Sequence, residues 1–322
     1  MKPLILRNVK LNPIVAEYVN QFYDVISVEE LTAENAHQIE VLLTNGTGQA
    51  PKELLDRLPN LKLIDDFGVG FDGVDIAECK RRNITVCTTP GVLTDDVADL
   101  ALAHILAFSR QMCLAHHEVV SGAWAAGHKS LGLGRKVSGK RVGIVGLGRI
   151  GKAVAQRCHG FNMSLAFYDR YLSADKAAAD LKAMLGVEPE LTRYDDLVEL
   201  ARNSDYLVVC AAATPENHGL INEEVLTALG PQGTLINIAR GVLVDEAALV
   251  KVLQEGKLGG AGLDVFAHEP NVPAALLTMK NVVLTPHIAS ATVETREQMA
   301  SLVIGNLKAF REGTPYLTAL TL

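Results

Sequence analysis

Arg240, Glu269 and His287 are polar residues that each come shortly after a run of residues typical of a β-strand. The three runs are Thr234–Ile238, Gly262–Val265 and Val282–Leu284. In a parallel sheet the carboxyl ends of the strands share one edge, where open α/β proteins bind ligands. Taken singly, Arg240 is better explained as a surface charge, Glu269 as a loop acid before a proline, and His287 as a satisfied histidine at a domain junction. Together, beside the nucleotide-binding motif described next, they predict a reactive site at that edge.

The stretch Lys140–Gly160 has the order strand, glycine turn, helix. The β-prone run Val142–Val145 leads directly into three glycines, and a helix-compatible segment follows. The first glycine can make the tight turn, the second leaves room for a pyrophosphate, and the third lets the helix pack close to the strand. The N–H groups and positive dipole end of the helix then face the phosphates. The residues predicted to contact a dinucleotide here are Gly146, Gly148, Arg149, Ile150 and Gly151.

An acidic residue strengthens the dinucleotide interpretation. The second strand-like run, Met163–Tyr168, ends in Asp169, about 20 residues beyond the motif, where an acid meets the ribose hydroxyls. The alternative is a plain βα turn with Asp169 as a solvated loop acid. Asp169 favours NAD, because a carboxylate repels the 2′-phosphate of NADP. Arg170 could pair with that phosphate if Asp169 swings away, so NADP or dual use stays open.

Composition limits the class of protein. The chain has 322 residues, of which 48% are hydrophobic and 21% charged, as in globular proteins of one or two domains. The net charge of −7 argues against nucleic acid as the main partner. Five widely spaced cysteines without a CxxC pair indicate neither a disulfide framework nor a zinc site, so no metal is expected. No signal peptide or membrane-spanning run is evident, and the predicted location is the cytoplasm.

Alternating strand and helix patterns along the whole chain predict an α/β fold with parallel sheets covered by helices. We expect two Rossmann-like domains with a cleft between them. Residues 1–95 and 288–322 form a flavodoxin-like substrate-binding domain, and residues 96–287 form an NAD(P)-binding Rossmann domain of six strands. An Ala/Leu-rich helix, Val97–Met112, is apolar around much of its circumference and should be buried between domains or at a subunit interface. The helix Thr292–Glu312 is expected to return to the first domain.

Five motifs in the same order resemble those of the D-isomer-specific 2-hydroxyacid dehydrogenases. They are the segments 68–75 (Gly-Val-Gly-Phe-Asp-Gly-Val-Asp), 146–151, 239–241 (Ala-Arg-Gly), 262–270 and 285–288 (Thr-Pro-His-Ile). The resemblance covers almost the whole chain. Residues 88–99 and the segment around Trp124 look most like those of glyoxylate/hydroxypyruvate reductases and hydroxyphenylpyruvate reductases.

The resemblance implies a role for each reactive residue. Arg240 would hold the substrate carboxylate and keto oxygen, assisted by the backbone N–H groups of Val69 and Gly70. His287 would donate a proton to the carbonyl oxygen during reduction and act as a base during oxidation. Glu269 would bond the other imidazole nitrogen and favour the charged ring.

The resemblance also implies cofactor contacts and a homodimer. Asp264 would meet the carboxamide of the nicotinamide, and Thr214, Ile238 and Ser290 would line the cofactor groove. The homodimer would be built on the nucleotide domain, and whether Trp124 reaches the partner's active site stays open. In two places the chain departs from many family members. Ala212 stands where they carry proline, and Ala289 where they carry glycine.

The expected activity is hydride transfer between a nicotinamide cofactor and a small 2-keto or 2-hydroxy acid, with glyoxylate and hydroxypyruvate as the first candidates. The same family pattern leaves an aryl pyruvate, phosphoglycerate, formate or phosphite open as the substrate. A third hypothesis is a non-catalytic dinucleotide-sensing protein that reuses the fold, which fold analogy alone does not exclude.

Overall fold

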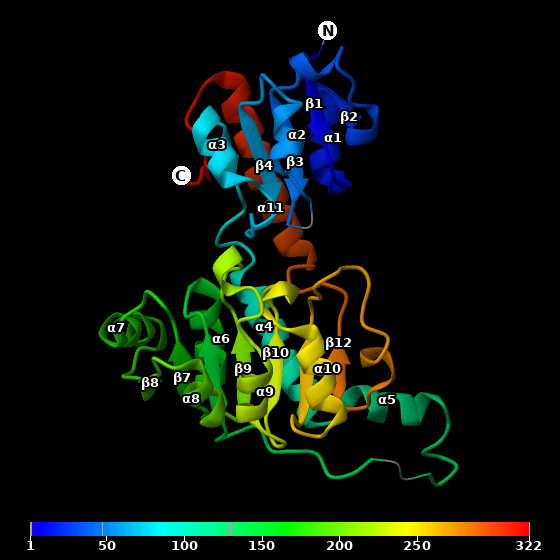
Figure 1. Cartoon of the computed structure of the whole chain (residues 1–322), viewed down its shortest axis with the longest axis vertical. Coiled ribbons are helices and arrows are strands. Elements are labelled where there is room, and N and C mark those ends of the chain that lie inside the picture. Colours follow the sequence, from blue (N-terminus) through cyan, green and yellow to red (C-terminus); the bar gives the residue numbers. More distant parts are fainter. Residues whose placement is uncertain (1, 47, 129–130, 322) are drawn as a thin grey trace. The chain divides into compact units, whose positions relative to one another are not determined.

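The computed structural model describes residues 2–46, 48–128 and 131–321. The chain forms two compact units (Figure 1). One contains residues 1–93 and 290–322, and the other residues 94–289. The predicted boundaries, after residues 95 and 287, lie close to these. The helix predicted near the C-terminus belongs to the first unit. Both units contain a parallel sheet flanked by helices, which confirms the predicted α/β fold.

The first unit contains a five-stranded parallel sheet in the order β2-β1-β3-β4-β5. Its strands are β1 (Leu4–Arg7), β2 (Asp24–Ser27), β3 (Val41–Asn45), β4 (Leu63–Phe67) and β5 (Thr85–Cys87). Its helices are α1 (Pro13–Phe22), α2 (Lys52–Asp56), α3 (Ile76–Arg82) and α11 (Val293–Glu312), with 3-10 turns at Val28–Glu30 and Ala36–Gln38. The order reverses beside β1, so the β1 and β3 ends flank the switch point of this sheet.

Alternation along each strand of this unit divides its core into two layers. Ile5 faces one layer and Leu6 the other, because successive side chains in a strand point to opposite faces. The Ile5 layer is covered by α1 and α11, through residues such as Val15 and Val303. The Leu6 layer is covered by α2 and α3. Helices on both faces explain why these strands read as nearly continuous apolar runs.

The core of the first unit also buries two adjacent acids, Asp65 and Asp66, each 1% exposed. Asn306 of α11 donates a hydrogen bond to Asp65 Oδ1 at 3.1 Å. Burial raises the pKa of the Asp65 carboxyl well above its usual range. The Asn306 hydrogen bond opposes this shift, and the nearby Asp66 adds to it. The folded unit therefore binds a proton at Asp65 more readily than the unfolded chain does.

We expect Asp65→Asn to raise the melting temperature more at pH 8 than at pH 5. The Asp65 pKa is higher in the folded state, so its contribution to stability is complete below about pH 3.9 and is lost as the pH rises through the folded value. Asparagine cannot ionise and still offers an oxygen to Asn306. Thermal unfolding at both pH values is the measurement, with Asp24→Asn at an exposed site as the control. An equal change in melting temperature at the two pH values would contradict the prediction.

The second unit contains a seven-stranded parallel sheet in the order β12-β11-β10-β9-β6-β7-β8. Its strands are β6 (Arg141–Val145), β7 (Ser164–Tyr168), β8 (Leu191–Arg193), β9 (Tyr206–Val209), β10 (Thr234–Asn237), β11 (Gly260–Leu263) and β12 (Val282–Leu284). The prediction of six strands was wrong, because β8 extends the edge beyond β7 through three residues with no strong β pattern. The strand predicted at Gly262–Val265 begins and ends two residues earlier, which leaves Asp264 just beyond its carboxyl end.

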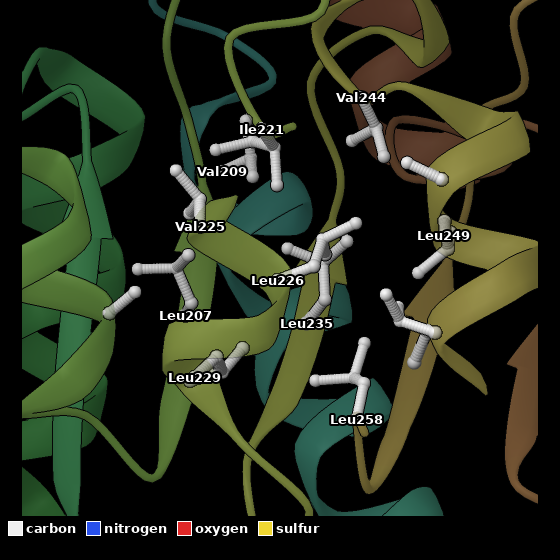
Figure 2. Close-up of a cluster of buried hydrophobic side chains, with 14 of the residues drawn as sticks. Leu207, Val209, Ile221, Val225, Leu226, Leu229, Leu235, Val244, Leu249 and Leu258 are labelled. Atoms are coloured by element: carbon white, nitrogen blue, oxygen red, sulfur yellow. The ribbon is translucent and has the colours of Figure 1, made fainter. Parts of the chain in front are cut away.

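One face of this sheet carries a large apolar cluster (Figure 2). Leu226 and Leu229 of helix α9 (Glu223–Leu229) lie over Leu207 and Leu235 of the central strands. The helices of the unit are α4 (Thr94–Ser109), α5 (Met112–Val120), α6 (Arg149–Gly160), α7 (Ala174–Leu185), α8 (Leu197–Arg202), α9 (Glu223–Leu229) and α10 (Glu246–Gln254). Three 3-10 turns complete the list, at Pro215–Asn217, Gly241–Leu243 and Leu276–Thr278. Helices α4 and α6 pack against each other, and α4 also contacts β10, β11 and β12.

The long apolar helix predicted at Val97–Met112 ends earlier, at Ser109, and a second helix follows. Gln111 adopts the left-handed region with φ 51°, which an α-helix cannot continue through. Among the described residues, no single helix is long and apolar enough to cross a membrane. By length and composition only, the pair α4 and α5 meets that criterion, but it is bent by 63° at the break.

Candidate active site

Arg240, Glu269 and His287 lie at the carboxyl edge of the second unit's sheet. They follow β10, β11 and β12, which are neighbours in the sheet. The structure therefore brings the three loops to one edge, as parallel pairing requires. His287 Nδ1 lies 2.7 Å from Glu269 Oε2. The Arg240 charge is near enough to act on the Glu269 carboxyl.

Only one oxygen of the Glu269 carboxylate, Oε2, contacts the His287 imidazole. Its other oxygen accepts a hydrogen bond from the Phe266 N–H at 3.0 Å. Burial alone would raise the pKa of Glu269. The hydrogen bonds from His287 and Phe266 N–H, together with the charges of His287 and Arg240, lower it below its usual value. The carboxylate is thus ionised near neutral pH, and it orients the imidazole so that Nε2 is left for a substrate.

Hydrogen bonds to Asp264, which is fully buried, hold the backbone of the His287 loop. His287 has φ 53°, an uncommon value for a residue with a side chain. Its N–H donates to the Asp264 carbonyl oxygen at 2.8 Å. The Asp264 carboxylate accepts hydrogen bonds from Thr285 Oγ1 at 2.6 Å and from the N–H groups of Ile288 and Ala289, each at 2.9 Å. In this structure the Asp264 carboxylate therefore holds the loop itself; its proposed contact with a carboxamide stays a prediction.

The Arg240 loop is shaped by Asn237, a residue that the sequence analysis did not select. Asn237 is 1% exposed, donates to the Arg240 carbonyl oxygen at 2.9 Å, and accepts from the Ala239 N–H at 3.1 Å. The residue that follows Arg240 must be glycine, because a Cβ on Gly241 would lie 1.9 Å from the carbonyl carbon of Phe266. This close approach places the Arg240 loop against the loop that carries Glu269. An asparagine at the end of a strand often hydrogen-bonds the backbone of the turn that follows, and this is the sequence signal by which the role of Asn237 could have been predicted.

The glycine motif forms the turn between β6 and α6. Gly146 has φ +88°, and a Cβ there would lie 2.7 Å from Ala211 Cα. A Cβ on Gly151 would lie 2.2 Å from the Gly146 carbonyl oxygen. Around Gly148 nothing lies within 4 Å of such an atom, so the backbone is open to a large ligand. This geometry fits a pyrophosphate on the first turn of α6, which contains Arg149 and Ile150.

Asp169 directly follows β7, beside this turn. Its Oδ2 accepts from the Leu147 N–H and its Oδ1 from the N–H groups of Tyr171 and Leu172, all at 2.9 Å. Each carboxylate oxygen can accept more than one hydrogen bond, so Asp169 keeps capacity for ribose hydroxyls. Arg170 is exposed. Hydrogen bonds to the side chains of Tyr171 and Tyr168 raise its pKa.

The other residues predicted to contact the cofactor or the substrate are divided between the two units. Thr214 is exposed after β9 at the start of a 3-10 turn, and Ile238 is 5% exposed after β10. Ser290 belongs to the first unit, as do Val69 and Gly70. Val69 and Gly70 are half-buried beyond β4, and neither N–H donates a hydrogen bond to the described part of the chain. Two unused donors in a glycine-rich bend suit an anion.

The described residues contain no group of three or more His, Cys, Asp or Glu side chains arranged to hold a metal ion. The groups that this edge offers to a ligand are the Arg240 guanidinium, the Glu269 carboxylate and the His287 imidazole.

Comparison of the chain with known protein families and structures agrees with these features. Residues 102–289 match the model of the D-isomer specific 2-hydroxyacid dehydrogenase NAD-binding domain. The chain belongs to this family, and it is an NAD(P)-dependent 2-hydroxyacid dehydrogenase.

Three relatives show how similar known members are. A hydroxyphenylpyruvate reductase of Plectranthus scutellarioides is 48% identical over 90% of this chain and 88% of its own. A glyoxylate/hydroxypyruvate reductase A of Arabidopsis thaliana is 44% identical over 89% of this chain and 87% of its own. The crystal structure of an NADPH-dependent glyoxylate/hydroxypyruvate reductase of Sinorhizobium meliloti, in complex with NADP and malonate, superposes with a TM-score of 0.89. It is 38% identical and covers 100% of this chain and 97% of that one.

Proposed function

We propose that the chain reduces small 2-keto acids, with glyoxylate and hydroxypyruvate as the preferred substrates. The observation that supports this most is the arrangement of Arg240, Glu269 and His287 on the ends of three neighbouring strands. A bound reduced nicotinamide supplies the hydride. Arg240 binds the carboxylate and the keto oxygen, and protonated His287 gives its proton to that oxygen from Nε2. Glu269 stabilises the charged imidazole. Taken by themselves, the Val69 and Gly70 N–H groups of the first unit suit an anion such as a carboxylate.

A second substrate class, an aryl pyruvate, is favoured by one feature. A cavity of about 250 Å³ lies beside the Glu269–His287 pair. Its walls are mostly apolar, from Phe266, Pro270, Val272, Leu277, Leu284 and Pro286. Such a lining suits an aromatic ring, and one relative is named a hydroxyphenylpyruvate reductase.

Cofactor consumption by the pure protein tests both substrate classes. NADH and NADPH are each crossed with glyoxylate, hydroxypyruvate, pyruvate and hydroxyphenylpyruvate. We expect the highest kcat/KM with glyoxylate or hydroxypyruvate. A higher value with hydroxyphenylpyruvate would favour the aryl class. Absence of turnover with every pair, while the cofactor still binds, would overturn both proposed substrate classes.

We propose NAD as the preferred cofactor, because the Asp169 carboxylate repels a 2′-phosphate. Asp169→Asn is expected to raise kcat/KM for NADPH about tenfold and to change that for NADH less, since the asparagine oxygen can still accept the hydrogen bonds from the Tyr171 and Leu172 N–H groups. Arg170→Ala should lower kcat/KM for NADPH alone. Asp175→Asn, an exposed acid in the first turn of α7, controls for general charge. Preference of the wild-type enzyme for NADPH would contradict this assignment.

We further propose a homodimer formed by the second unit. Large apolar side chains are exposed along α5 and beyond it: Met112 at 55%, Val119 at 57%, Val120 at 65%, Trp124 at 68% and Leu133 at 99%. Several large apolar side chains exposed within one segment support an interface there. Sedimentation velocity should show a dimer that Val120→Asp converts to a monomer, while Val187→Asp, at 51% exposure elsewhere, leaves it intact. A monomeric wild-type protein at micromolar concentration would refute the dimer.

The five free cysteines suit our proposed location, the cytoplasm.

A further inference from the structure

One buried histidine lies outside the machinery described so far. His104 is in the middle of α4, is 1% exposed, and faces the sheet among apolar neighbours such as Ala101 and Ile105. Its Nε2 lies 2.9 Å from Thr285 Oγ1, a residue 181 positions further along the chain. The sheet makes room for the ring, because a Cβ on Gly262 would lie 2.8 Å from His104 Nδ1.

The directions of the hydrogen bonds around Thr285 follow from its neighbours. Three donors converge on the Asp264 carboxylate, and an ionised carboxylate only accepts. The Thr285 hydroxyl therefore donates to Asp264, and its lone pairs face His104. His104 Nε2 must then carry a hydrogen and donate it to Thr285. The chain of donors runs from His104 through Thr285 to Asp264.

The protonation state of His104 agrees with this order. Burial lowers the pKa of the His104 imidazole, against an opposing effect of the Asp264 charge. The neutral ring has its hydrogen on Nε2, so Nδ1 is a bare acceptor. Within the described residues, Nδ1 has no hydrogen-bond partner. A charged ring would leave a buried N–H donor unsatisfied there, which costs more than a bare nitrogen.

The chain of donors ends on the loop that carries His287. Asp264 holds this loop at four points: the Thr285 hydroxyl and the N–H groups of His287, Ile288 and Ala289. Three of the four act through the carboxylate, so the position of His287 depends on how that carboxylate is turned. The His104 donor keeps the Thr285 hydroxyl pointing at Asp264 and prevents it from rotating away.

We propose that His104 is a positioning residue of this enzyme, whose Nε2–H acts through the Thr285 hydroxyl on Asp264 to hold His287 in register with Glu269. The proposal rests on the proposed role of His287 as the proton donor. A buried histidine that merely stabilises the fold is the competing explanation, and the two differ in what they predict for kcat.

His104→Leu removes the N–H that donates to the Thr285 hydroxyl. His104→Gln keeps an N–H donor, on a side chain of similar length. We expect His104→Leu to lower kcat about fivefold to tenfold, the effect of one modest hydrogen bond, with KM for the 2-keto acid and NADH changed less than twofold. His104→Gln should recover most of the loss. Ser109→Ala is the matched control in the same helix, because Ser109 is 2% exposed and its hydroxyl bonds Tyr206 at 2.7 Å, away from the loop. It should lower the melting temperature without changing kcat.

A lower melting temperature with wild-type kcat in His104→Leu would overturn the proposal. If that variant does not fold, the Thr285→Val and Thr285→Ser pair replaces it. The valine variant should lose kcat as His104→Leu does and the serine variant should keep it. Equal kcat in the two would also overturn the proposal. When the leucine and valine variants both fold, combining them should cost no more than the larger single loss, since both break one chain.

Nitrogen-15 NMR of the histidine rings provides a test that is independent of activity. In the wild-type protein we expect His104 to stay neutral with its hydrogen on Nε2 between pH 6 and pH 8. A hydrogen on Nδ1, or a charged ring, would overturn the assigned order of donors. If instead His287→Asn keeps full turnover, the proposed role of His287 fails while the His104 tautomer still stands, so the two failures are distinguishable.

Discussion

His287→Asn should lower kcat for 2-keto acid reduction by about 10²- to 10⁴-fold, the usual contribution of a positioned general acid. Asparagine is the sharpest substitution here, because it tolerates the left-handed backbone that His287 adopts at φ 53°. It cannot deliver a proton to the keto oxygen. The binding of NADH, followed by its fluorescence, should be unchanged, since the imidazole is assigned to the substrate.

His268→Asn is the matched control for this prediction. His268 is exposed and lies next to Glu269, so its replacement perturbs the same loop without removing the proposed acid, and turnover should be retained. Wild-type turnover by the His287 variant would refute the mechanism. Glu269→Gln tests the partner of His287: the amide oxygen cannot orient the imidazole as firmly as the ionised carboxylate at 2.7 Å does, so kcat should fall while NADH binding is kept.

Arg240→Gln should lower kcat/KM for the 2-keto acid by about 10²- to 10⁴-fold. This range corresponds to the loss of two charge-assisted hydrogen bonds of about 1.5–3 kcal/mol each. The planar guanidinium can contact both the carboxylate and the keto oxygen, whereas a lysine ammonium is a point charge. Arg240→Lys should therefore recover only part of the activity. The melting temperature should change little, because the loop is held mainly by the Asn237 side-chain amide and by the close packing of Gly241.

Steady-state kinetics with glyoxylate and hydroxypyruvate is the measurement for Arg240. Arg202→Lys, at an exposed position on α8, is the control for the exchange of one basic residue by another. A wild-type KM and kcat in Arg240→Gln would show that another cation binds the carboxylate. The two sets of variants together separate proton delivery, which His287 supplies, from anion binding, which Arg240 supplies.

Local patterns were sufficient to place the reactive residues on the fold. Arg240, Glu269 and His287 follow β-prone runs, and parallel strands end at one edge, so their gathering could be predicted without coordinates. The glycine motif likewise specified a strand, a turn and a helix, because a Cβ at Gly146 or at Gly151 would lie under 3 Å from neighbouring backbone atoms. The five motifs together were sufficient for the family.

Weak local signals account for the elements that were predicted wrongly. The edge strand β8 is three residues long, with two of them exposed, and has no apolar alternation to reveal it. The helix predicted to run on to Met112 breaks at Gln111, where no glycine or proline marks the change. Both depend on how neighbouring elements pack rather than on local propensity.

The amino-acid sequence by itself determined the fold class, the nucleotide-binding turn and the set of residues at the sheet edge, because each follows from short-range patterns and the geometry of parallel strands. Only the tertiary structure decided how that set is supported. It joined His104 to Thr285 across 181 positions, turned the Asp264 carboxylate onto the His287 loop, and packed Gly241 against Phe266. Hydrogen bonds between residues far apart in the chain leave no periodic trace, so they emerge only when the strands and helices have packed.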